Sequence, residues 1–154
     1  MAPIAKHASG WSLRVIGSLL MLCFVMSCHD NKPTENRSGQ DDVLKEKINS
    51  LQYEPLGTIN LGNACAVRTE NTEYIIEQKD RAVPLLIEAL KNNEKPVQVA
   101  YAAYCLRRIG SDKGKEVAAV AYERLAKRGE ELRIEERFAR SELKDYLDSL
   151  NENR

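Results

Sequence analysis

The cysteines and histidines of the sequence limit the chemistry that its side chains could perform. The 154 residues include four cysteines and two histidines, and both histidines, His7 and His29, lie near the N-terminus. A nucleophilic cysteine or serine normally needs a neighbouring base, most often histidine, and histidine is also a common zinc ligand. The rest of the chain, which contains Cys65 and Cys105, lacks that partner. The sequence therefore predicts no catalytic residue, no metal site and no cofactor, and we do not expect an enzyme.

Two acidic pairs, Glu130-Glu131 and Glu135-Glu136, are the next candidates for chemistry. Neighbouring residues on a helix point in different directions, so these carboxylates are expected on solvated faces and not around one substrate. The chain has no glycine-rich phosphate loop and no CxxC pair. Its 23 basic and 23 acidic residues balance, without the clustered basic excess of a nucleic-acid-binding protein. We therefore expect no nucleic-acid partner.

The N-terminal residues are patterned like an export signal. Residues 1–14 contain Lys6 and Arg14 and no acid, and residues 15–26, VIGSLLMLCFVM, are almost wholly apolar. A basic segment followed by a short apolar run is typical of a secretory signal peptide. The run is short for a membrane span, which needs about 20 residues. We expect a signal peptide over residues 1–27.

The four residues Val25-Met26-Ser27-Cys28 resemble the bacterial lipobox. That pattern has an aliphatic residue three before the cysteine and a small residue directly before it; Met26 fits it less closely. Cys23 is a rival, but the large Leu22 precedes it. The resemblance implies that Cys28 is diacylated through its sulfur and becomes the mature N-terminus, on a membrane facing the periplasm or the cell exterior. The alternatives are an ordinary signal peptide with a chance cysteine, or an uncleaved anchor helix over residues 11–27.

The chain after the signal divides into a tether and a domain. Residues 29–40, HDNKPTENRSGQ, contain no apolar residue and include Pro33 and Gly39, so residues 28–40 are expected to form a flexible tether. From residue 41 apolar residues recur every three or four positions, which indicates helices near 41–54, 80–91, 96–109, 113–128 and 131–150. We prefer a bent helix for residues 56–79, although a strand in part of it is open. The predicted domain, 41–154, is all-α.

Residues 81–110, RAVPLLIEALKNNEKPVQVAYAAYCLRRIG, resemble one HEAT-like (armadillo-type) helical repeat. The matching features are the Ala-Val-Pro-Leu-Leu opening, the Pro-Val start of the second helix, its Ala-Ala pair and the Ile-Gly exit. Tyr101 and Arg107 stand near the second helix where the family usually has a charged residue and a glycine. The resemblance implies a short α-α superhelix that binds other molecules and performs no catalysis.

Two sets of residues in this domain are candidates for a role. Export to an oxidising compartment favours a disulfide between Cys65 and Cys105, the alternative being two reduced thiols in the core. Tyr101, Tyr104 and Arg108 share one side of a helix and could bind a partner, since tyrosine and arginine are frequent at interface hot spots. Ordinary packing of the tyrosines between helices is the alternative.

These observations lead to two hypotheses about function. The first is a membrane-anchored envelope lipoprotein that binds another envelope protein through its helical-repeat surface. The second is an envelope inhibitor or immunity protein that blocks a toxin or hydrolase. Small size, an anchor and a disulfide suit both hypotheses equally, and the identity of the partner does not follow from the residues.

Overall fold

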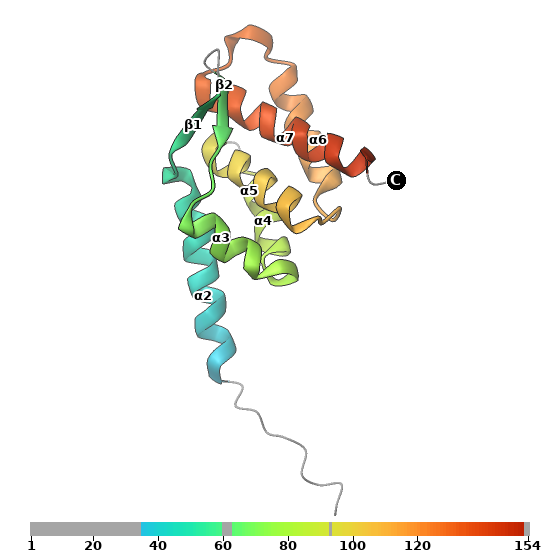
Figure 1. Ribbon diagram of the computed structural model, residues 1–154. Helices are drawn as coiled ribbons and strands as arrows, with labels where there is room; N and C mark the ends of the chain where they lie inside the picture. The colour runs from blue at the N-terminus through green and yellow to red at the C-terminus, as the bar shows by residue number, and fades with distance from the viewer. Residues whose placement is uncertain (1–34, 60–62, 93, 153–154) are drawn as a thin grey trace, which may run out of the picture. The chain divides into compact units, whose positions relative to one another are not determined.

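A computed structural model of the chain describes residues 35–59, 63–92 and 94–152. The chain divides into two compact units, residues 1–36 and residues 37–154. The second unit is described here, together with residues 35 and 36, where its first helix begins. The described residues form six α-helices and one two-stranded sheet (Figure 1), which confirms the predicted all-α class. The predicted signal peptide and Cys28 lie outside the described residues. Within the described ranges, no helix has both the length and the apolar character needed to cross a membrane.

The elements follow one another with short connections. The α-helices are α2 (Glu35–Ser50), α3 (Glu70–Glu77), α4 (Val83–Leu90), α5 (Pro96–Ile109), α6 (Lys115–Ala126) and α7 (Ile134–Glu152). The strands are β1 (Leu56–Ile59) and β2 (Asn63–Ala66), which pair antiparallel. Three short 3-10 helices complete the chain: η1 (Leu51–Tyr53), η2 (Lys79–Arg81) and η3 (Gly129–Glu131).

Helix α5 lies at the centre of the unit. It packs most extensively against α7, and also against α4, η1, α3 and β2 (Figure 1). Apart from Tyr104, all its residues from Gln98 to Leu106 are buried, so little of its middle reaches solvent. A helix that is apolar nearly all round is expected in a core. The small side chains of Ala100, Ala102 and Ala103 allow its neighbours to approach closely.

Strands β1 and β2 correct the prediction of a bent helix, because they pair antiparallel with Leu56 opposite Ala66. A two-stranded hairpin is marginal by itself, and here β2 packs against α7 and α5. Gly57 permits the tight packing: a Cβ placed on it would overlap Val67 and lie 3.0 Å from the Cys65 sulfur. The helical part of the prediction is confirmed only for α3, whose N-terminus is closed by a reciprocal capping box between Thr69 and Thr72.

The predicted helix boundaries are mostly right where proline or glycine sets them. Pro96 begins α5, and Gly110 ends it in the left-handed conformation with φ 75°. The helix predicted from residue 80 begins later, because residues 79–81 form η2 and Ala82 occupies the cap position of α4. The predicted tether is too long, because α2 already begins at Glu35 and contains Gly39. Glycine inside a helix costs about 0.5–1 kcal/mol relative to alanine, which a helix of 16 residues can absorb.

Candidate binding groove along helix α4

Tyr101 was predicted to contact a partner, and that prediction is wrong. Its side chain is completely buried, with 0% exposure, and its ring packs edge-on against Phe138. The hydroxyl donates a hydrogen bond to the Pro55 carbonyl and accepts one from the Val67 amide at 3.3 Å. Burial raises the pKa of Tyr101, so the hydroxyl stays protonated. Its role is to hold the hairpin ends against α5, which covers the face predicted to be open.

The other two residues of that predicted patch lie nearer the surface. Tyr104 is half-buried, with the Arg107 guanidinium 5.8 Å from its ring centroid, and Arg108 is exposed. Without Tyr101 they do not form the single three-residue surface that was expected. Tyr104 and Arg108 remain accessible to a partner, but no hollow described below includes them.

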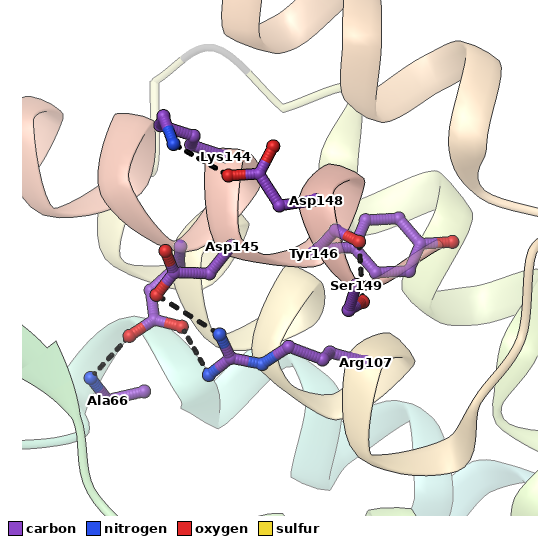
Figure 2. A network of polar contacts seen from close by, with 8 residues as sticks. Ala66, Arg107, Lys144, Asp145, Tyr146, Asp148 and Ser149 are labelled. Atoms are coloured by element: carbon purple, nitrogen blue, oxygen red, sulfur yellow. Dashed lines mark hydrogen bonds and ion pairs between the residues drawn. The ribbon is translucent and has the colours of Figure 1, made fainter. Parts of the chain in front are cut away.

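A buried polar cluster joins β2, α5 and α7. Glu142 is 4% exposed, and its carboxylate accepts hydrogen bonds from the Ala66 amide at 2.8 Å and from Arg107 Nη2 at 3.3 Å. Arg107 also pairs with Asp145 at 3.1 Å, so its guanidinium spans two carboxylates of α7 (Figure 2). Burial raises the pKa of Glu142, while the Ala66 amide and Arg107 oppose that shift. The cluster ties β2 and α5 to α7, and the sequence analysis did not predict it.

The two cysteines of the domain are free thiols in the structure. Cys105 is fully buried on α5, and Cys65 on β2 is half-buried. Burial raises the pKa of Cys105 to about 12, so its thiol stays protonated and is a poor nucleophile. The Cys65–Cys105 disulfide expected for the exported chain stays a prediction.

Two hollows border α4 on the side of α2. One, of about 400 Å³, is lined by Lys45, Ile48, Asn49, Leu85, Glu88, Ala89, Lys91, Asn92 and Gln98. A second, of about 660 Å³, is lined by Gln40, Asp41, Lys45, Arg81 and Leu85. The two hollows share Lys45 and Leu85, so they adjoin each other. Together they make an open groove between α2 and α4, which we call the α2–α4 groove.

Amide side chains line the inner end of this groove. Gln98 is 3% exposed; its Nε2 donates to the Ile48 carbonyl at 3.0 Å and its Oε1 accepts from Asn92 Nδ2 at 3.4 Å. These bonds fix both amides in place. Asn49 is exposed on α2 and adds a third amide. Ile48, Leu85 and Ala89 supply the apolar wall between them.

The charges along the α2–α4 groove leave one cation in excess. Lys91 pairs with Glu88 at 2.7 Å, and Arg81 pairs with Asp41 at 2.8 Å. Lys45, at the junction of the two hollows, forms no ion pair with any described residue. The groove thus combines hydrogen-bonding amides, an apolar wall and one unpaired positive charge. The sequence analysis missed it, because polar residues on two separate helices carry no signal that they face one another.

No protein-family model, no curated protein and no solved structure matches the chain. The resemblance of residues 81–110 to a HEAT-like repeat stays a prediction. Among the residues that the structure describes, no group of three or more histidine, cysteine, aspartate or glutamate side chains could hold a metal ion.

Proposed function

We propose that the chain is an exported lipoprotein, anchored through Cys28, whose domain binds an extended acidic segment of another envelope protein in the α2–α4 groove. The observation that carries the binding role is the groove itself, with fixed amides and an unpaired lysine. The anchor and the compartment are supported by the leader and by the lipobox resemblance of residues 25–28.

The groove chemistry suits a peptide in an extended conformation. Such a peptide presents backbone N–H and C=O groups along its length, and a side-chain amide both donates to and accepts from them. Asn49 and Asn92 sit on opposite sides of the hollow, on α2 and after α4. The apolar wall formed by Leu85 and Ala89 can take alternate side chains of the peptide. The size of each hollow lies in the 300–1,000 Å³ range of ordinary ligand sites.

The charge of the groove determines which kind of peptide segment it prefers. The unpaired Lys45 favours a ligand with a carboxylate near the middle of the groove, and an acidic segment provides one. Exposed charge pairs contribute only about 0.2–1 kcal/mol each, so the amides and the apolar wall must supply most of the affinity. Charge therefore sets selectivity more than strength.

Binding of a labelled acidic peptide to the full-length protein in detergent tests the groove. The probe is an extended hexapeptide of alternating glutamate and alanine, compared with the same peptide carrying glutamine in place of glutamate. Lys45→Glu should weaken binding of the acidic peptide by about two- to thirtyfold, because it removes one attraction and adds one repulsion of about 0.2–1 kcal/mol each. Lys115→Glu makes the same charge change on α6, away from the groove, and should alter binding less than twofold.

Equal binding of the acidic and amide peptides, or of the Lys45→Glu and unmodified proteins, would reject the acidic-segment proposal. A photo-cross-linker in place of Asn49 then locates the natural ligand in intact cells. The cross-linked segment should be acidic, and a cross-linker in place of Val120, exposed on α6, should not reach it. Cross-links from Asn49 to folded, neutral surfaces would count against the groove.

A further inference from the structure

A small pocket lies where α5, α6 and α7 meet. Its volume is about 110 Å³, and its floor is apolar, formed by Val99, Leu125 and Ala139. Arg124 from α6, Arg128 from the segment after α6, and Glu136 from α7 complete the wall. The result is a partly open pocket with an apolar base and a charged rim.

The glutamate of this rim is already fully engaged. Glu136 was expected on a solvated face, but it is 5% exposed. Its carboxylate accepts a hydrogen bond from the Arg133 amide at 2.9 Å and pairs with the guanidinium of Arg128. The Arg133 amide, then Arg128, hold the pKa of Glu136 below its ordinary value, so the group stays ionised. Glu136 and Arg128 thus offset each other's charge.

Arg124 is the rim residue without a partner. It is half-buried, and it forms no hydrogen bond or ion pair with the residues that the structure describes. A guanidinium has five N–H donors, and those of Arg124 are free to bind an acceptor. The pocket lining therefore carries one positive charge in excess, from Arg124, beside an apolar floor.

The geometry points to a binding site for a carboxylate that carries a short aliphatic group. The Arg124 guanidinium takes the carboxylate, which it can bind through two parallel hydrogen bonds, and the aliphatic group covers Val99, Leu125 and Ala139. The volume equals that of three or four water molecules at about 30 Å³ each, which limits the ligand to a few heavy atoms. An inorganic anion would leave the apolar floor uncovered.

Two sources could supply this chemistry: the C-terminal residue of a polypeptide, or a free short-chain carboxylic acid. The site does not depend on the function proposed for the α2–α4 groove, although Asn92 borders both spaces. Binding is measured by isothermal titration and by amide chemical shifts on the full-length protein in detergent. The probes are N-acetyl-glycyl-alanine, the same dipeptide as its C-terminal amide, and isobutyrate.

The free-acid dipeptide or isobutyrate should bind, and the dipeptide amide should bind at least tenfold more weakly than the acid. Arg124→Gln should weaken binding of the acid at least tenfold. Lys127→Gln removes the same charge from the exposed end of α6 outside the pocket and should change binding less than twofold. Lys45→Glu should leave it unchanged, which separates this site from the groove. Far-ultraviolet dichroism confirms that each variant is folded.

Preference for the dipeptide acid identifies a polypeptide terminus as the source, and equal or better binding of isobutyrate identifies a free acid. The inference is overturned if the amide binds as well as the acid, if Arg124→Gln binds like the unmodified protein, or if neither acid binds at millimolar concentration.

Discussion

Glu136 and Glu142 lie on the same helix, are both nearly buried, and have pKa values shifted in opposite directions. For Glu142 burial dominates and raises the pKa. For Glu136 the hydrogen bond from the Arg133 amide dominates and lowers it. The difference lies in what the surroundings offer the charged form of each carboxylate. These directions fix the sign with which each residue contributes to stability as the pH changes.

The free energy of unfolding of the Glu142→Gln variant, relative to that of the unmodified protein, should increase as the pH rises from about 4 to 7. A raised pKa in the folded state means that the Glu142 contribution is complete below the ordinary glutamate pKa of about 4.3 and is lost as the pH rises through the folded value. Urea unfolding of both proteins at several pH values measures the difference. A variant that becomes less stable relative to the unmodified protein as the pH rises would contradict the assigned cause.

Glu136→Gln should behave in the opposite way. A lowered pKa means that the Glu136 contribution is present above the ordinary glutamate pKa and is lost as the pH falls through the folded value. The variant should therefore lose about 1.5–3 kcal/mol at pH 7, the range for hydrogen bonds to charged groups, and less at pH 3. The same urea series measures it, and a loss that is equal at both pH values would refute the assignment.

At the scale of single residues, the sequence predicted little of the burial and hydrogen bonding of these side chains. Glu135 and Glu136 look equivalent in the sequence. Only Glu136 is engaged by the Arg128 guanidinium and the Arg133 amide in the folded chain. Tyr101 looked like a surface tyrosine because the hairpin ends that cover it precede it by 34 to 46 positions in the chain. Side-chain environments created by distant segments leave no local trace in the sequence.

Helix ends, in contrast, were largely predictable, because the residues that set them act locally. Pro96 fits the first turn, where its missing N–H is not needed, and Gly110 adopts the left-handed conformation that ends α5. The sequence analysis missed the hairpin because packing against other elements stabilises it. Four-residue strands carry too short a pattern, and their pairing is stabilised by α5 and α7.

Gly110→Ala and Gly39→Ala should have opposite effects on stability. A Cβ at either glycine has no atom within 4 Å, so neither change introduces a clash. At Gly110, with φ 75°, an alanine would cost about 1–2 kcal/mol, because its side chain disfavours the left-handed conformation. At Gly39, inside α2, alanine should gain about 0.5–1 kcal/mol.

Thermal unfolding followed by circular dichroism at 222 nm compares the two variants with the unmodified protein. Gly110→Asn serves as a control, since asparagine tolerates the left-handed conformation better than alanine and should lose less. A Gly110→Ala protein as stable as the original would show that α5 does not need this ending.

For the whole molecule, Cys28→Ala tests the proposed anchor and with it the compartment of the binding groove. The variant lacks the sulfur that would be acylated, so it should leave the membrane fraction, whereas Cys23→Ala should stay there. Fractionation of cells and mass analysis of the mature N-terminus measure both. Retention of the Cys28→Ala protein on membranes, with its mass unchanged from that of the full chain, would rule out the anchor.

The early start of α2 has a consequence for where a partner can be found. On the proposed anchor, the six residues 29–34 lie between Cys28 and the first residue of α2, and six residues of chain reach at most about 20 Å. A domain anchored in this way would search for ligands by lateral diffusion close to its own membrane. Proteins resident near that membrane surface would be within its reach, and more distant ones would have to come to it.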